Sequence, residues 1–150
     1  MAKAKKQRIV LKGNLKDDSI IIGSHGDANV QIEGVFDLSG IIYCPKYTVT
    51  VSIKGDGKIT FRGKCNTLII KKMKGSCTLD LSELTCKELR CECIGGQALV
   101  IAGKTRIITR ANLADEAELR LGENPLITSS MVLDSSRIVY RSLRNADLLQ

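Results

Sequence analysis

Residues 48–72 read TVTVSIKGDGKITFRGKCNTLIIKK, and this stretch contains three short segments of alternating polarity, 48–53, 58–63 and 67–72. Within each segment, β-branched or other apolar side chains alternate with polar ones. Such alternation is typical of β-strands that bury one face. Only a few residues, rich in Gly and Lys, separate the segments, so we expect short corners between strands.

The same pattern recurs along nearly the whole chain, at residues 8–13, 19–23, 29–34, 40–44, 77–82, 88–93, 98–103, 105–110, 117–122 and 137–142. One central residue from every second segment gives a series with steps of 21, 18, 20, 20, 20 and 19 residues: Ile20, Ile41, Ile59, Leu79, Leu99, Leu119 and Ile138. A two-strand unit repeated at this spacing indicates a stacked solenoid. We therefore predict an all-β, single-domain β-helix or β-solenoid with about seven turns of roughly twenty residues.

The expected domain boundaries are a basic leader at 1–7, the β-solenoid at 8–142 and a C-terminal cap or tail at 143–150. A β-sandwich also has strands every 8–12 residues, but two-residue hairpin turns are nearly lacking, Gly55-Asp56-Gly57 being the one candidate. The best helical candidates are 111–119 and a short capping helix at 142–150.

The bulk composition is that of a soluble globular chain. The 150 residues carry a formal net charge of +7, which favours polyanionic partners but does not specify a fold. No run is long and apolar enough for a membrane span, and the apolar stretch after the basic start is too short for a signal peptide. We expect a cytoplasmic protein as the sequence stands, or a surface or periplasmic one if an export signal was trimmed.

Four of the six cysteines lie between residues 77 and 96. Cys77, Cys91 and Cys93 alternate in step with leucines, so we expect them to face the interior as small apolar side chains. A metal site would need a second cysteine pair or histidines at suitable spacing, and the single histidine, His25, is distant in sequence. A disulfide within the Cys91–Cys93 strand would be too long. Cys65 and Cys86 fall at similar points of successive turns and could stack as a ladder.

Catalytic chemistry has few candidates. Ser24, His25 and Asp27 form a tight corner rather than a nucleophile site, and the carboxylates fall at outward positions or corners: Asp17, Asp18, Asp80, Glu83, Glu88, Glu92, Asp115 and Glu116. We predict no catalytic residue, no cofactor and no metal ligand, and a protein that is not an enzyme. An enzyme would be of the polysaccharide-cleaving β-helix kind, but those need longer loops to build a cleft.

Positive charge is concentrated in two stretches, and the second gives the possible anion-binding residues. Residues 1–16 contain no acid and include Lys3, Lys5, Lys6, Arg8, Lys12 and Lys16. Residues 54–74 contain one acid, Asp56, and the cations Lys54, Lys58, Arg62, Lys64, Lys71, Lys72 and Lys74. On adjacent turns these seven could form a basic stripe for nucleic acid, an anionic glycan or lipid headgroups. The alternative is a solvated face that blocks aggregation. Phe61 should point inward and not serve for base stacking.

The ends of a solenoid are unpaired strand edges that can template further pairing. The lysines of the leader and the C-terminal segment could block these edges. Alternatively the edges pair, giving homo-oligomers or filaments. The leading hypothesis is a non-catalytic structural or interaction module that self-associates; the alternatives are a binding module for an anionic polymer and a bactofilin-like cytoskeletal filament protein.

The motifs GDG (55–57), LDLSEL (79–84), LRCECIGG (89–96) and LGENP (121–125) also support a family comparison. Over residues 55–125 the sequence resembles the GIN-type domain, a family described as putative autotransporter adhesin heads and common in Bacteroidetes. The resemblance implies a right-handed β-helix-like fold and an adhesin-head-like or scaffold role. It implies no particular functional residues.

Overall fold

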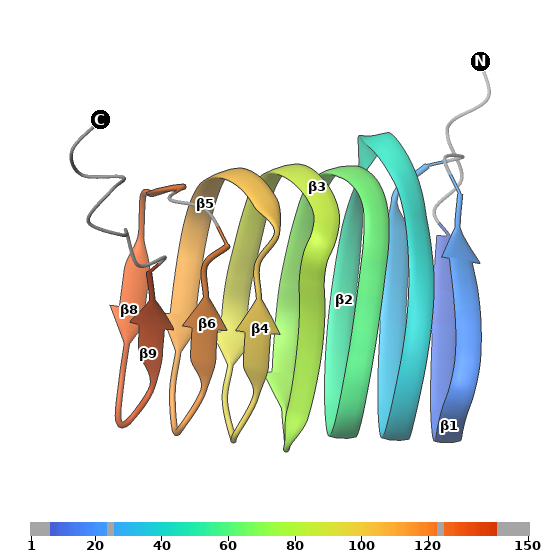
Figure 1. Ribbon diagram of the computed structural model, residues 1–150, viewed down its shortest axis with the longest axis horizontal. Helices are drawn as coiled ribbons and strands as arrows, with labels where there is room; N and C mark the ends of the chain where they lie inside the picture. The colour runs from blue at the N-terminus through green and yellow to red at the C-terminus, as the bar shows by residue number, and fades with distance from the viewer. Residues whose placement is uncertain (1–6, 24–25, 123–124, 141–150) are drawn as a thin grey trace, which may run out of the picture.

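The computed structural model describes residues 7–23, 26–122 and 125–140, which form a coil of parallel strands stacked side by side (Figure 1). The strands are β1 (Gln7–Ile22), β2 (Ala28–Lys74), β3 (Cys77–Ile94), β4 (Leu99–Ile101), β5 (Lys104–Leu113), β6 (Glu118–Arg120), β7 (Leu126–Ile127), β8 (Ser130–Val132) and β9 (Arg137–Val139). Within these ranges there is no helix, and hence none that could cross a membrane.

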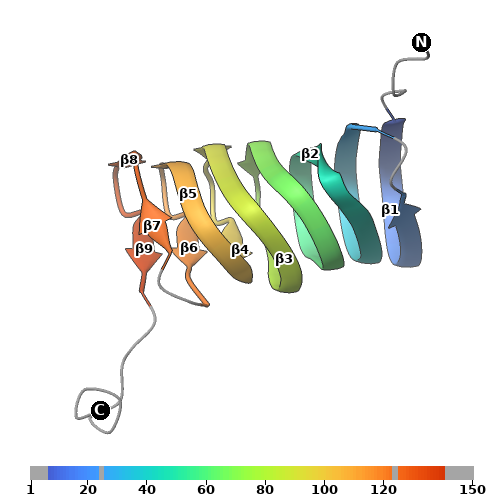
Figure 2. The same ribbon diagram turned by 90° about the horizontal axis from the view of Figure 1, so that it is seen from above.

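Each turn of chain lies on the previous one in parallel register, which confirms the predicted β-solenoid, here with about six turns. Gln7 pairs with Ala28, Gly57 with Cys77 and Leu99 with Glu118. The number of residues between register partners therefore varies between 19 and 21 along the chain. Figure 2 shows the coils following one another in sequence order from β1 to β9.

Each coil contains three strand segments, where the sequence pattern indicated two. In the last coil these are β6, β7 and β8, after which β9 returns onto β6. Earlier coils pass their corners without leaving extended structure, and β2 alone runs for 47 residues. The strand β5 pairs with both β7 and β8, so one long strand covers two sides of the coil. Its alternation continues past the corner, and the sequence pattern therefore shows these two sides as one segment.

Three expectations about the ends and helices have different outcomes. The candidate helix at 111–119 is wrong: β5 ends at Leu113, a turn follows, and β6 begins at Glu118. The leader cations Lys3, Lys5 and Lys6 lie outside the described residues. So does the proposed C-terminal cap or tail at 143–150.

The core fills the inside of the coil with columns of aliphatic side chains. Ile59, Leu79, Val100 and Leu119 are register partners on four successive coils, and all are fully buried. Phe61 is fully buried as predicted, and its ring lies where a Cβ on Gly40 would come within 2.5 Å. The absence of a side chain at Gly40 therefore admits the largest of the fully buried side chains.

One corner of the coil is formed by residues with positive φ. Five glycines occupy it on successive coils, Gly13, Gly34, Gly55, Gly75 and Gly96, followed by Asp115 and Asp134 with φ of 57° each. A Cβ on Gly55 would lie 1.9 Å from the Gly34 carbonyl oxygen. Where aspartates take over, each carboxylate accepts a hydrogen bond from the corner N–H of the coil before: Gly96 to Asp115 at 2.8 Å and Asp115 to Asp134 at 3.1 Å.

Candidate anion-binding site

All seven predicted anion-binding side chains are exposed, but the coil distributes them over different parts of the surface. Lys54, Lys72 and Lys74 line one hollow together, Arg62 lines a second and Lys64 a third. Lys58 is ion-paired, and Lys71 lines none of these hollows. The stretch 54–74 spans a full coil, so its residues face in several directions and do not form a single stripe.

The first hollow has a volume of about 350 Å³ and brings together three of the predicted cations, Lys54, Lys72 and Lys74. Its lining also contains the acid Glu33, whose carboxylate lies 3.9 Å from the Lys12 ammonium, with both side chains exposed. Exposed ion pairs of this kind contribute little. The hollow is therefore positive overall, with one acid at its edge.

Two other predicted cations have acidic neighbours. The Lys58 ammonium lies 3.8 Å from Asp80, and Arg62 is the register partner of Glu83. Burial raises the pKa of Asp80, but hydrogen bonds from Ser82 and the charge of Lys58 outweigh it and hold that pKa below its ordinary value. Lys58 is thus engaged with a carboxylate on the next coil.

The Lys64 hollow, of about 280 Å³, is also basic. It is lined by cations of three successive coils: Lys64, Lys87, Lys104 and Arg106. Pro45, Thr85, Cys65, Cys86 and Thr105 complete the lining, which contains no acid. Sequence reasoning found only Lys64, because it counted charges along the chain. The signal was available in the repeat: Lys64 pairs with Thr85 and Thr85 with Lys104, two coils further on.

The floor of the Lys64 hollow is a column of small side chains. Cys65, Cys86 and Thr105 are register partners on successive coils, which confirms the predicted Cys65–Cys86 ladder. Cys86 Sγ lies 3.3 Å from Thr105 Oγ1. The Cys65 thiol, as well as the Thr105 hydroxyl, can hydrogen-bond to a Cys86 thiolate, which lowers the pKa of Cys86 and raises that of Cys65.

The remaining cysteines of the 77–96 stretch divide between core and surface. Cys77 and Cys91 are buried as predicted, and burial raises the pKa of Cys77 to about 11 and of Cys91 to about 12. Cys93 is exposed, so the expectation that it faces inward is wrong. The pairing of β3 with β5 is irregular between Cys91 and Ile94, and Ile94 takes the buried position there.

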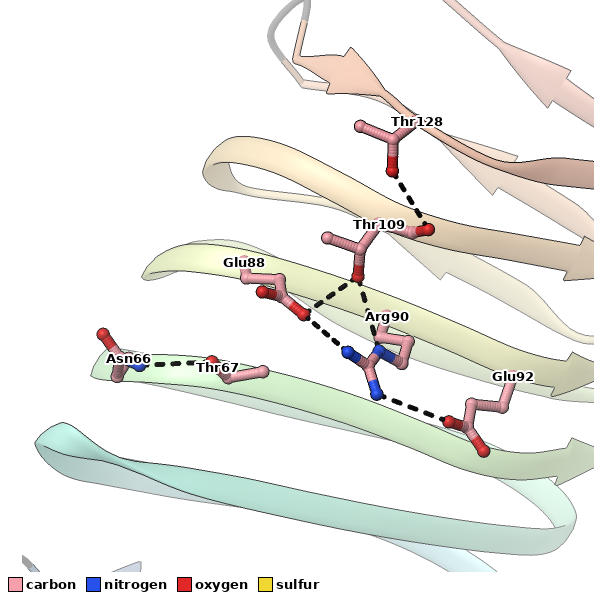
Figure 3. Close-up of polar contacts among 7 residues, drawn as sticks. All are labelled: Asn66, Thr67, Glu88, Arg90, Glu92, Thr109 and Thr128. Atoms are coloured by element: carbon pink, nitrogen blue, oxygen red, sulfur yellow. Dashed lines mark hydrogen bonds and ion pairs between the residues drawn. The ribbon is translucent and has the colours of Figure 1, made fainter.

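Two of the carboxylates weighed as catalytic candidates, Glu88 and Glu92, belong to a cluster of polar contacts in β3 that reaches the next coil. Arg90 lies between Glu88, at 3.2 Å, and Glu92, at 3.8 Å (Figure 3). Thr109 on the next coil donates its hydroxyl to Glu88 at 2.9 Å, and Thr128 donates to the Thr109 carbonyl at 3.1 Å. This arrangement joins β3 to β5 and pairs both carboxylates with Arg90.

The Glu118 carboxylate has shorter contacts with arginine than Glu88 and Glu92 have. Glu118 is nearly buried and accepts hydrogen bonds from Arg137 at 2.6 Å and from Arg120 at 2.7 Å. Burial raises its pKa, but the two arginines outweigh burial and hold the pKa below its ordinary value. The site joins β6 to its register partner in β9.

Metal binding finds no support in residues 7–23, 26–122 and 125–140, where no three His, Cys, Asp or Glu side chains gather closely enough to share an ion. Ser24 and His25 of the tight-corner candidate lie outside the described residues. Searches of family models, curated protein sequences and solved structures give no match to this chain, so its relation to the GIN-type domain stays a prediction.

Proposed function

We propose that this protein is a non-catalytic β-solenoid scaffold that self-associates through its end coils. The supporting observation is that core columns lose their cover at the last described coil. Leu113 is buried, with 2% of its surface exposed, whereas its register partner Val132 is 42% exposed. Leu126, Met131 and Leu133 of the same coil are at least half exposed.

The opposite end has the same character to a smaller degree. Ile9 and Leu11 of β1 are only partly buried, although their register partners Val30 and Ile32 are fully buried. Among the described residues, both end coils therefore combine a strand edge that has no further partner with apolar side chains that would gain burial under another layer. A second copy supplies such a layer with strands of the same kind, because every pairing between the described strands is parallel.

Light scattering coupled to size-exclusion chromatography tests the proposal across protein concentration. The wild-type chain should shift from monomer to dimer or longer assemblies, and Val132→Glu should remain monomeric. Val35→Glu is the matched control, since Val35 is also about half exposed, at 49%, but lies on the side of the second coil. A monomeric wild type, or equal loss of assembly in both variants, would contradict the proposal.

Two further outcomes identify what covers the open end. Filaments in electron micrographs would favour the bactofilin-like form of assembly over a closed dimer. If a chain ending at residue 140 assembles while the full chain stays monomeric, the C-terminal segment and not a second copy is the cover.

The second candidate function, binding of an anionic polymer, is favoured by the Lys54, Lys72 and Lys74 hollow. Binding of a single-stranded oligonucleotide should weaken steeply with salt, because lysine–phosphate contacts release counterions. The triple change Lys54→Glu, Lys72→Glu and Lys74→Glu should abolish it. Changing Lys16, Lys46 and Arg110 to Glu makes the same change in net charge outside this hollow, and equal losses in the two variants would mean that no defined site exists.

A further inference from the structure

The Lys64 hollow has a regular construction that follows from the stacking of coils. Its floor is the column Cys65, Cys86 and Thr105, and one wall is the column Lys64, Thr85 and Lys104. Lys87 and Arg106 form the other wall, each one residue beyond a floor residue in sequence. The hollow exists because small side chains lie between long ones on three consecutive coils.

The charge of this hollow is unbalanced. Four cations line it and no carboxylate does, whereas Lys58 and Arg90 elsewhere are paired with acids. Like charges on neighbouring strands repel each other. Lys64 and Lys104 are two coils apart, which corresponds to about 10 Å at the usual strand spacing. An anion with charge distributed over a comparable length would relieve the repulsion at both ends of the hollow.

One neutral donor is available between the cations. Thr85 is exposed in the wall between Lys64 and Lys104, whereas the Thr105 hydroxyl and the Cys86 thiol are buried in the floor, 3.3 Å from each other. Phosphate oxygens accept hydrogen bonds from hydroxyl, ammonium and guanidinium groups, and arginine binds them in a fork. The lining therefore offers charge and hydrogen bonds to the same ligand.

We propose that this hollow binds a compact chain of linked phosphates, such as a di- or triphosphate, with Lys64, Lys87, Lys104 and Arg106 as its ligands. The site is separate from the end coils and, apart from Lys64, from the 54–74 cations. It does not depend on self-association, so either proposal can fail without the other.

Isothermal titration calorimetry with sodium tripolyphosphate at low salt measures the site directly. The wild-type chain should bind with a dissociation constant that rises with salt, and the double change Lys64→Gln and Lys104→Gln should weaken binding at least about tenfold. Lys16→Gln with Lys71→Gln removes the same charge at exposed positions that line neither basic hollow, and should leave the affinity within about twofold. Unchanged affinity in the first variant, or equal losses in both, would overturn the proposal.

Alkylation by iodoacetamide gives a second reading, followed by peptide mass spectrometry. Cys86 in the floor is only 4% exposed, so its modification requires local opening of the hollow, and bound tripolyphosphate should slow it by stabilising the closed form. Cys93 is exposed and is not among the lining residues, so its rate should not change. Equal rates at Cys86 with and without tripolyphosphate would contradict binding in the hollow.

The source of the phosphate chain is distinguished by comparing ligands. Adenosine triphosphate binding as tightly as tripolyphosphate would show that the hollow recognises the phosphate chain alone. Tighter binding of the nucleotide would show that its base or sugar adds contacts, with the same dependence on Lys64 and Lys104. Binding of neither ligand would overturn the proposal.

Discussion

At the scale of single residues, Glu118 shows how this fold accommodates a carboxylate among strands. Its side chain is only 11% exposed, and it lies between Arg120 of its own strand and Arg137 of the next coil. The arginines are themselves mostly exposed, so they bring charge to the carboxylate without being buried with it. This geometry avoids much of the desolvation cost of a fully buried ion pair.

Glu118→Gln should lower the free energy of unfolding by about 1–2 kcal/mol at neutral pH, since three charge-assisted hydrogen bonds from two arginines are weakened. The folded-state pKa of Glu118 lies below its ordinary 4.5. Its contribution is therefore complete above pH 4.5 and is lost as the pH falls through the folded-state pKa. Urea denaturation of both chains should show a stability difference that disappears on acidification.

Glu83→Gln provides the control. Glu83 is exposed and lines a hollow with one arginine, Arg62, whereas Glu118 is held by two arginines. The free energy of unfolding of the Glu83→Gln variant should stay within about 0.5 kcal/mol of that of the wild type. A pH-independent loss in Glu118→Gln would mean that the side chain acts by packing and not by its charge.

Residue-level prediction from the sequence succeeded within strands and failed at corners. Alternation correctly placed Phe61, Cys77 and Cys91 in the core. It misplaced Cys93 because a strand irregularity shifts the inward position to Ile94. A period of two carries information only along uninterrupted pleated backbone, and the sequence does not show where each corner interrupts it.

At the scale of the element, the glycine corner explains why so many coils can stack tightly. Each glycine has a positive φ, and a Cβ at Gly34, Gly55 or Gly75 would lie within 2.2 Å of the carbonyl oxygen one coil before. The contact is therefore backbone to backbone. Gly13 begins the column, and a Cβ there would meet nothing within 4 Å.

This difference predicts unequal costs for the same substitution. Gly13→Ala adds only conformational strain from its φ of 105°, about 1–2 kcal/mol. Gly55→Ala adds a clash 1.9 Å from the Gly34 oxygen to similar strain, so it should cost several kcal/mol or prevent folding. Thermal unfolding followed by circular dichroism measures both, and equal costs would show that the stacked corner is not as tight as described.

The repeat itself could be predicted because its spacing is a property of the sequence. The predicted series correctly placed Ile59 with Leu79 and Leu119 with Ile138. It chose Leu99, whereas Val100 is the buried partner of Leu79. Register partners are separated by 21 residues in some coils and by 19 in others. A series of regular steps can therefore be one residue off, and the spacing alone does not say which of two adjacent residues faces inward.

The candidate sites were predicted less well than the fold for a related reason. A basic stretch of sequence wraps around the coil, so Lys54 and Lys64 line different hollows. Lys64 and Lys104 are forty residues apart and line the same hollow. Surface sites in a solenoid are columns across coils, and finding them requires the register as well as the composition.

At the scale of the whole molecule, stability should vary along the coil axis. Each inner coil packs against two neighbours, while β1 and the coil of β7 and β8 each have a described neighbour on one side (Figure 1). In proteins of stacked repeats, stability is a sum of repeat and neighbour terms, so end repeats open most easily. All residues of β8 are exposed, which makes it the weakest described layer.

Native-state hydrogen exchange should therefore give a gradient. Amides of β3 and the later part of β2 should be the most protected, and those of β7 and β8 at least about tenfold less protected. If end coils associate as proposed, raising the protein concentration should increase protection at the ends and leave the middle unchanged. Val132→Glu should remove that concentration dependence. Protection that is uniform along the chain would mean that the coil opens as one cooperative unit, and the neighbour-by-neighbour account of its stability would then be wrong.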